Sequence, residues 1–331
     1  MFMRNIIIRK ITDNNLKIAK DYILSDRLVA FPTETVYGLG GNALSDAAIK
    51  SIYAAKGRPS DNPLIVHVDK DRDISDLVYD DREYARKIRE AFLPGPLTMV
   101  YRSKDVVSPL CSCGLNTLAI RVPKSEAAQR FLKIVGVPIA APSANKSKHT
   151  SPVTAEHVYG DFGSEVPLIL DGGRCEGGIE STVLDVTGEV PVILRKGLVT
   201  AEMIKSVVGV CEYARDGSSL SARSPGTKYR HYCPKTETAL FSADELDKAV
   251  RLYEEYERLG KRACFLAKSE VCERLSGKRY FDLGKTGKEM AARLYYYLHE
   301  GEKYDMLIGI RFLPEDEFML GVENRFLKAF G

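Results

Sequence analysis

The chain has 331 residues, of which 44% are hydrophobic and 28% charged, and its formal net charge is +3. This balance is typical of a globular protein and excludes disorder over most of the length, while the length itself favours two domains. No stretch approaches the roughly 20 consecutive apolar residues of a membrane-spanning helix, so no membrane association is expected. The seven cysteines, an odd number spread along the chain, favour reduced thiols and a cytoplasmic location.

Strand-like and helix-like segments alternate from the N-terminus onward. Short runs rich in Val, Ile and Leu predict strands at 6–11, 28–34, 63–69, 96–102, 117–124, 137–143, 167–173, 181–186 and 190–196. Apolar residues spaced three and four apart predict helices at 45–58, 81–92, 125–136 and 200–209. This order predicts an α/β or α+β fold around a substantial twisted sheet.

The alternation stops at residues 212–236, which are rich in Gly, Pro, Ser and charged residues and predict a linker. After it, strands are predicted at 238–242, 262–267, 279–284 and 305–313, with helices between them and at 315–331. Ser242 with Glu245, and Thr286 with Glu289, have the spacing of capping boxes at helix starts. We therefore predict a first domain at 1–211, a linker at 212–236, and a small three-layer α/β domain with a parallel sheet at 237–331.

The two regions differ slightly in charge. Residues 235–331 hold 17 Lys and Arg against 18 Asp and Glu, so the positive excess lies in residues 1–234. A mildly basic first region favours an anionic ligand, but it is too weak to indicate a nucleic-acid groove by itself.

Lys56 continues the apolar stripe of Ile49, Ile52 and Tyr53, at the end of a predicted helix. Two interpretations are open. Lys56 and Arg58 can meet the last carbonyls of the helix, as cations at helix C-termini commonly do. A lysine on a buried stripe, however, needs an anionic partner, which points to a binding site.

Polar side chains also interrupt the apolar pattern of three predicted strands. Arg121 shares a strand face with Thr117, Arg195 shares one with Ile193, and His67 shares one with Ile65. Each of these can be a satisfied core or strand-edge residue. If Arg121 and Arg195 converge with the cations near residue 56, together they form a site for several negative charges.

Two loops and a cysteine pair complete the candidate chemistry. Ser143 and Asn145 follow an apolar strand, where they can bind a ligand or simply form a turn. The glycine-rich segment 171–182 matches neither a P-loop nor a dinucleotide fingerprint. Cys111 and Cys113 have no second pair at zinc-finger spacing, and no metal site is expected.

Taken in order, several segments resemble the YrdC-type threonylcarbamoyl-AMP synthase family in its long two-domain form. They are FPTETVYGLG, AAKGRPSDNPLIVHV, LPGPLT, TLAIRVP, PSAN, GGIESTVLDV, ILRKG and SPGTKYRHYCP, all within residues 31–234, and the closing GVENRFLKAFG. The linker motif departs from the usual family pattern at Thr227 and Cys233. The resemblance covers essentially the whole chain.

The resemblance implies a fold and a reaction. The fold is a YrdC-like twisted mixed sheet with a concave basic pocket at 1–211, a linker and lid at 212–236, and a Rossmann-like domain at 237–331. The reaction converts L-threonine, bicarbonate and ATP into threonylcarbamoyl-adenylate and pyrophosphate, with Mg²⁺ expected alongside the triphosphate. Downstream transferase proteins then modify tRNA, which this chain is expected to contact indirectly or weakly.

The family's motifs also imply roles for individual residues. The Lys-x-Arg and Ser-x-Asn signatures make the catalytic set Lys56, Arg58, Ser143 and Asn145. ATP would be bound by Arg58, Asn62, Thr117, Ser143, Ser151, Arg195 and Tyr232, the last as part of the lid. Threonine would be bound by Thr35, His67, Arg121, the Ala141 backbone and Ser181.

Two other functions are weighed against the synthase. An RNA-binding module on a YrdC-like sheet has weaker support, because Trp is absent and basic and aromatic residues are not interleaved. Carbamoyl transfer, as in hydrogenase-maturation proteins with a related domain, would bring zinc-finger segments, and the chain has no CxxC pairs.

Overall fold

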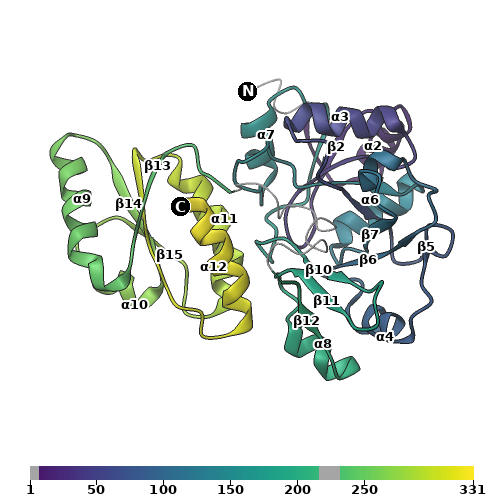
Figure 1. Cartoon of the computed structure of the whole chain (residues 1–331). Helices are drawn as coiled ribbons and strands as arrows, with labels where there is room; N and C mark the ends of the chain where they lie inside the picture. The colour runs from purple at the N-terminus through teal and green to yellow at the C-terminus, as the bar shows by residue number, and fades with distance from the viewer. Residues whose placement is uncertain (1–6, 216–231) are drawn as a thin grey trace. The chain divides into compact units, whose positions relative to one another are not determined.

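A computed structural model describes residues 7–215 and 232–331 (Figure 1). The chain divides into two compact units, each with its own sheet. The first unit comprises Met1–Ser147 and Pro152–Tyr229, and the second comprises Lys148–Ser151 and Arg230–Gly331.

The first unit is built on a mixed sheet, as the sequence predicted. Its strands are β1 (Ile8–Lys10), β2 (Val29–Phe31), β3 (Gly38–Asn42), β4 (Ile65–His67), β5 (Val78–Tyr79), β6 (Leu97–Ser103), β7 (Thr117–Arg121), β8 (Ile139–Ala140), β9 (Ile169–Asp171), β10 (Thr182–Asp185), β11 (Val192–Arg195) and β12 (Glu212–Tyr213). They follow the order β1-β9-β2-β3-β8-β4-β7-β6-β10-β11-β12, and β5 pairs with β6. The sheet contains both parallel pairs, such as β9 with β2 and β4 with β7, and antiparallel pairs, such as β2 with β3 and β6 with β7. Strands distant in sequence therefore lie side by side.

Helices surround this sheet. They are α2 (Asp13–Leu24), α3 (Asp46–Lys56), α4 (Glu83–Phe92), α5 (Pro109–Ser112), α6 (Glu126–Val135), α7 (Ala155–Phe162) and α8 (Ala201–Val208). The four predicted helices correspond to α3, α4, α6 and α8. The sequence analysis missed α2 and α7, which start at the caps Thr12 and Thr154.

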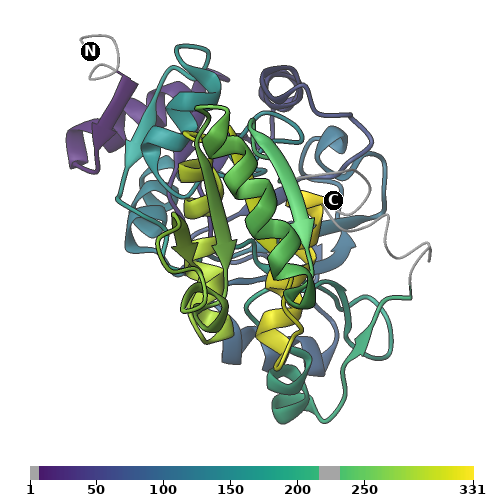
Figure 2. The ribbon, with the colours of Figure 1, turned by 90° about the vertical axis from the view of Figure 1, so that its left-hand side faces the viewer.

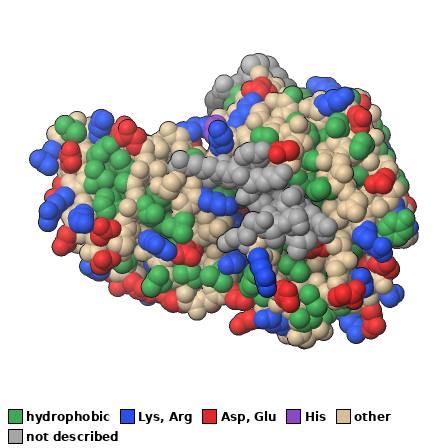
Figure 3. All heavy atoms as spheres, in the orientation of Figure 1, with side chains coloured by type: hydrophobic (Ala, Val, Ile, Leu, Met, Phe, Trp, Pro, Cys, Tyr) green, Lys and Arg blue, Asp and Glu red, His purple; other side chains and the backbone are tan. Residues whose placement is uncertain are grey.

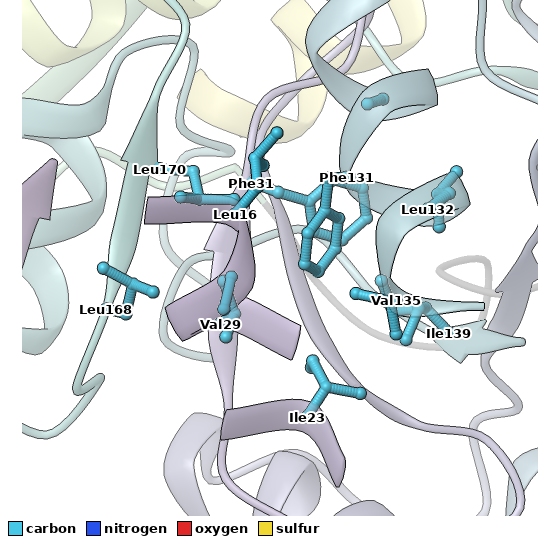
Figure 4. Close-up of a cluster of buried hydrophobic side chains, with 13 residues drawn as sticks. Leu16, Ile23, Val29, Phe31, Phe131, Leu132, Val135, Ile139, Leu168 and Leu170 are labelled. Atoms are coloured by element: carbon cyan, nitrogen blue, oxygen red, sulfur yellow. The ribbon is translucent and has the colours of Figure 1, made fainter. Parts of the chain in front are cut away.

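A hydrophobic core forms where α2 and α6 cover strands β2, β8 and β9 (Figure 4). The contributing side chains include Leu16, Ile23, Val29, Phe31, Phe131, Leu132, Val135, Ile139, Leu168 and Leu170. Burying one large apolar side chain of this kind contributes about 1.5–3 kcal/mol, so this cluster stabilises the part of the sheet around β9, β2 and β8.

Strand β3 was not predicted, because its sequence GLGGN lacks the β-branched residues that mark strands. Its glycines are needed for close packing. A Cβ on Gly40 would lie 2.9 Å from Ile139 Cγ2 and 3.0 Å from Phe31 Cε1. Only a residue without a side chain fits between those neighbours. Gly40 therefore lets the side chains of Phe31 in β2 and Ile139 in β8 pack directly against the backbone of β3.

The second unit has the parallel α/β architecture that the sequence predicted. Its elements are β13 (Glu237–Phe241), the short helix η2 (Ala243–Glu245), α9 (Leu246–Arg258), β14 (Ala263–Ala267), α10 (Ser269–Cys272), β15 (Tyr280–Asp282), α11 (Gly287–Gly301), β16 (Met306–Ile310) and α12 (Glu317–Phe330). The strands follow the order β13-β16-β14-β15, and every neighbouring pair is parallel. Both predicted capping boxes, at Ser242 and Thr286, are confirmed.

Helices cover the second sheet on both faces (Figures 1 and 2). On one face, α9 and α10 bury side chains against β14 and the alternate residues Met306, Ile308 and Ile310 of β16. On the other face, α12 approaches β16 so closely that a Cβ on Gly309 would lie 2.8 Å from the Phe330 ring. The sheet is therefore the middle of three layers.

The second unit includes four residues from an earlier part of the chain, which the sequence did not predict. His149 forms a bridge with Cys233, and the Cys233 amide donates to the Lys148 carbonyl at 2.9 Å. The Thr150 hydroxyl donates to the Tyr232 carbonyl at 3.3 Å, and Nε2 of His299 lies 3.2 Å from the Ser151 carbonyl. Segment 148–151 thus adds to the fold of the second unit.

Across residues 7–215 and 232–331, none of the helices has both the length and the apolar character to cross a membrane.

Candidate active site

A row of polar residues crosses the centre of the first sheet. In the registers of β4, β7 and β6, His67 lies opposite Arg121, and Arg121 lies opposite Thr98. Residues directly opposite in paired strands project from the same face. The pairing therefore brings His67 and Arg121 together, although 54 positions separate them in the chain.

Arg121 is only 4% exposed and pairs with Glu34, whose Oε1 lies 2.8 Å from its Nη2. The second oxygen of Glu34 accepts from the Lys124 amide at 3.0 Å, so the carboxylate is itself held in place. Nε of Arg121 is buried and has no hydrogen-bond partner within the described part of the chain. A buried donor left in this way is costly, and an anion at that edge of the guanidinium would satisfy it.

His67 is buried beside this cation. Burial, and next the Arg121 guanidinium, lower the pKa of His67 to about 3, so the ring is neutral at physiological pH. Its Nδ1 lies 3.2 Å from the Ile65 carbonyl, and its ring meets Phe31 edge-on with centroids 5.9 Å apart. A neutral imidazole here adds no second positive charge to the site, and it can still hydrogen-bond a ligand.

Lys56 is buried at the end of α3, on the stripe that the sequence predicted. Its ammonium donates to the Ser143 carbonyl at 2.6 Å and to the Asn145 carbonyl. Burial, and next the Arg58 guanidinium, hold the pKa of Lys56 well below its usual range. The lysine therefore ties the Ser143–Asn145 turn to α3 through carbonyl oxygens. The sequence analysis left open whether Lys56 meets the last helix carbonyls or an anionic partner, and these carbonyls belong to a distant turn.

Arg58 and Asn62 belong to the loop that follows α3. Gly57 ends the helix with a φ of 59°, in the left-handed region that glycine tolerates best. Nε of Arg58 donates to the Asn62 carbonyl at 3.3 Å, and Nη2 donates to the Pro63 carbonyl at 3.2 Å. Asn62 is buried, as is Thr117 at the start of β7. Lys56, Arg58 and the Ser143–Asn145 turn thus lie together.

Arg195 and Ser181 form a second group, at the edge of β10. Nε and Nη2 of Arg195 donate to the Ser181 carbonyl at 3.1 and 2.9 Å. The Ser181 hydroxyl lies 2.8 Å from the Thr98 hydroxyl, which links this group to the His67–Arg121 row. Arg195 and Arg121 therefore lie on either side of Thr98 and Ser181, with Arg195 bonded to Ser181 and Arg121 opposite Thr98 in the strand register.

Thr35 lies in the loop between β2 and β3, and Ala141 directly follows β8. The Thr35 hydroxyl is buried 2.9 Å from the Thr33 hydroxyl. The Ala141 amide donates to the Ile65 carbonyl at 2.9 Å, so its carbonyl oxygen is the backbone group to consider for a ligand.

Two predicted nucleotide-binding residues, Ser151 and Tyr232, belong to the second unit. Tyr232 is buried with a φ of 71°, and its ring stacks on Tyr295 with centroids 5.3 Å apart. The rest of the predicted lid motif, residues 224–231 with Thr227, lies outside the described residues.

Sequence reasoning missed Glu34 and Thr98 as members of the site. Both lie inside motifs that were recognised, FPTETVYGLG and LPGPLT. A signal was present, because Glu34 is an acidic residue in an otherwise uncharged motif. What it pairs with depends on the tertiary structure.

The donor set does not suit a resident metal ion. Within residues 7–215 and 232–331, no three His, Cys, Asp or Glu side chains gather as a metal site. The residues predicted for the nucleotide are cations, amides and hydroxyls, which suit phosphate oxygens. These side chains therefore do not provide a binding site in which the protein itself would hold Mg²⁺.

A cavity of about 820 Å³ adjoins Glu34 in the first unit, but none of the predicted site residues lines it. Its walls come from residues 10–11, 32–34, 124–127, 130 and 171–176. The candidate site considered below is therefore the polar row around His67 and Arg121, which does not line this cavity.

Comparison with known proteins follows the same division of the chain. Residues 21–197 match a family model described as "Telomere recombination", and residues 199–331 match one described as "Threonylcarbamoyl-AMP synthase, C-terminal domain". Proteins named threonylcarbamoyl-AMP synthase are 38% identical in Pyrococcus abyssi and 39% identical in Bacillus subtilis. The alignments cover 97% of this chain in both cases, and 96% and 95% of those relatives.

A solved structure agrees with these relatives. The crystal structure of P. abyssi Sua5 complexed with L-threonine matches with a TM-score of 0.87 and 36% sequence identity. The match covers 98% of this chain and 97% of that one, so both units have counterparts there. From the two matched domains and the full-length similarity, we conclude that the chain belongs to the threonylcarbamoyl-AMP synthase family in its two-domain form.

Proposed function

We propose that the chain forms L-threonylcarbamoyl-adenylate from L-threonine, bicarbonate and ATP, with release of pyrophosphate. The observation that carries this proposal in the structure is Arg121, a buried guanidinium with a donor still to be satisfied, beside a neutral His67. Such a group suits the carboxylate of an amino acid in a site closed to water.

On the threonine side, Arg121 binds the substrate carboxylate through its Nε edge. Glu34 acts as a positioning residue, because its ion pair keeps the guanidinium in one orientation. His67, the hydroxyls of Thr35 and Ser181 and the Ala141 carbonyl complete the contacts to the hydroxyl and amino groups of threonine.

On the nucleotide side, Arg58 and Arg195 neutralise the phosphates, and Asn62, Thr117, Ser143 and Ser151 supply neutral contacts. Asn145 completes the turn that Lys56 holds. An ammonium has three N–H donors, and two of those of Lys56 reach carbonyl oxygens, so the third is directed to a phosphate or carbamate oxygen. Tyr232 covering the nucleotide as part of a lid stays a prediction.

The chemistry follows from this charge arrangement. The threonine amine attacks the carbon of bicarbonate and forms a C–N bond. A C–O bond of the bicarbonate breaks, water leaves, and a carbamate remains. A carbamate oxygen then forms a bond to the α-phosphorus of ATP, and the bond to the β-phosphate oxygen breaks, so pyrophosphate leaves. Substrate carboxylate, carbamate and triphosphate repel one another, and fixed cations at Lys56, Arg58, Arg121 and Arg195 offset that repulsion.

Several features of the proposal extend beyond the chain itself. Mg²⁺ is expected to arrive with ATP as part of the substrate. Downstream transferase proteins would take the product to tRNA, with indirect or weak tRNA contact by this chain. A cytoplasmic location rests on the odd number of cysteines and stays a prediction.

The experiment that tests the reaction measures pyrophosphate release by the full chain from MgATP. L-threonine and bicarbonate are each supplied or omitted. We expect release only when both are present. Release from MgATP alone would contradict the proposed acceptor.

Absence of release, together with salt-sensitive RNA binding, would favour the RNA-binding alternative. Figure 3 shows basic and acidic side chains intermixed over the described residues of the face that it draws.

The assignment of the threonine site is tested in the same assay with Arg121→Ala. Loss of a buried, charge-assisted contact should raise the KM for threonine by about 10- to 100-fold while the KM for ATP changes little. Arg102→Ala, which removes an exposed arginine of β6, is the matched control and should leave both KM values unchanged. A larger effect on ATP than on threonine would show that Arg121 has been assigned to the wrong substrate.

A further inference from the structure

We propose that the second unit holds a separate binding site for a nucleoside monophosphate, at the carboxyl edge of its parallel sheet. The proposal concerns only the second unit and does not depend on the reaction proposed for the first. It starts from topology. The chain leaves β13 and β14 toward α9 and α10 on one face, but it leaves β16, which lies between them, toward α12 on the other face. Where neighbouring strands exit to opposite faces, a crevice opens beyond their carboxyl ends, and this is where open α/β sheets bind ligands.

A cavity of about 450 Å³ lies at that position. Its lining begins at the carboxyl ends of all three strands, at Ser242 after β13, at Lys268 after β14 and at Ile310, the last residue of β16. This volume falls within the range of small-molecule sites, which is about 300–1,000 Å³.

The base of the cavity carries a buried cation. Lys268 is 4% exposed, and its ammonium pairs with Glu315 and, at 3.8 Å, with Glu270. The side chains of those glutamates are themselves 65% and 67% exposed. A buried ammonium requires an anionic partner, whereas an exposed carboxylate loses little when it turns into water. The anionic group of a ligand can therefore take the place of Glu315 on Lys268.

The walls indicate what is attached to that anion. The apolar part of the lining consists of Val271, of Ile310 and Phe312, which are only 1% and 7% exposed, and of Leu313, which is 76% exposed. An apolar side chain so exposed next to a cavity gains by covering a flat ring. Asp244 and Glu270 at the rim can accept hydrogen bonds from ribose hydroxyls, as acidic residues do in related parallel folds. A ligand that places an anionic phosphate on Lys268, a flat base against Leu313 and ribose hydroxyls near Asp244 and Glu270 is a nucleoside monophosphate.

The test uses AMP as the probe and the full chain labelled at Ile, Leu and Val methyl groups. Shifts of the Val271, Ile310 and Leu313 methyl signals report binding in this cavity and are separate from any nucleotide bound in the first unit. We expect saturable shifts with AMP and much smaller shifts with adenosine, which lacks the phosphate. Equal responses to AMP and adenosine, or no shift at these methyl groups, would overturn the proposal.

Two substitutions should change the affinity in opposite directions. Lys268→Met should weaken AMP binding by at least about tenfold, because it removes a charge-assisted contact. Glu315→Ala should strengthen it by about two- to fivefold, because it removes the carboxylate that competes for the ammonium. Glu315 is exposed, so its variant keeps the test valid even if Lys268→Met folds poorly. Lys278→Met is the matched control, since Lys278 is an ion-paired lysine of the same unit outside the cavity. Equal affinity in the Lys268 and Lys278 variants, or unchanged affinity in Glu315→Ala, would refute the site.

Discussion

At the scale of single residues, the candidate site depends on pairs that only the fold brings together. Arg121 can present its Nε edge to a ligand because Glu34 occupies another of its nitrogens. Lys56 can hold the Ser143–Asn145 turn because it is the last residue of α3 and its ammonium reaches two carbonyl oxygens of that turn. The residue types were recognisable in the sequence, but Glu34 as the partner of Arg121 was not, because 87 positions separate the two.

His67 leads to a prediction about pH. Its pKa is lowered to about 3 in the folded protein from the ordinary value of about 6.5, so between these values the unfolded chain binds a proton that the folded chain does not. Stability therefore rises with pH across this window and falls as the pH drops from about 6.5 toward 3. Between pH 7 and pH 4.5 the wild type should lose about 2–3 kcal/mol more unfolding free energy than His67→Gln.

Urea unfolding followed by circular dichroism at the two pH values measures this difference. Groups other than His67 titrate alike in both proteins, so their contributions to the pH dependence cancel when the variant is subtracted from the wild type. Parallel loss of stability in wild type and variant would show that His67 titrates normally in the folded state.

At the scale of elements, the alternating pattern located most helices and strands, and it failed where local signals are weak. Strand β3 was missed because close packing requires glycines there, and glycine carries no strand signal. Helices α2 and α7 were missed although Thr12 and Thr154 cap them. Strand β12 pairs with β11 at Glu212 and Tyr213, where the composition suggests a linker.

Gly197 offers a test of how an element positions the site. A Cβ at this residue would overlap the Thr182 amide nitrogen and lie 2.6 Å from the Ser181 carbonyl carbon. Both contacts are backbone, so Gly197→Ala must displace the segment that carries Ser181. We expect a loss of about 1–3 kcal/mol in stability and a raised KM for threonine.

Gly160 in α7 is the matched control, because a Cβ there meets no atom within 4 Å. Gly160→Ala should stabilise the protein by about 0.5–1 kcal/mol, since alanine favours a helix. Thermal unfolding and threonine kinetics of the two variants check this pair. Equal behaviour of both variants would mean that the backbone near Ser181 yields without cost.

At the scale of the whole molecule, each unit has a hydrophobic core built from its own residues. One core contains Phe131 with the neighbours shown in Figure 4, and the other contains Phe265 stacked on Tyr253 with centroids 5.3 Å apart. Separate cores permit separate unfolding, as is common in chains of more than one domain.

Calorimetry of core variants tests this independence. Phe131→Ala and Phe265→Ala each remove a fully buried ring, at an expected cost of about 3–5 kcal/mol. We expect two transitions, of which the first variant lowers one and the second variant lowers the other. If both variants lowered a single shared transition by similar amounts, the two units would have to unfold together.

The sequence alone determined the class of fold, the parallel second sheet and the family, because periodicity, capping residues and motifs are local along the chain. The residues of the candidate site were named from the same motifs, and their roles stay a prediction. Tertiary structure decided the rest. Strand register placed His67 beside Arg121, folding brought Glu34 to that guanidinium, and segment 148–151 joined the second unit. Strand order also opened the cavity at Lys268, and none of these outcomes has a local signal, because each depends on which distant segments pair.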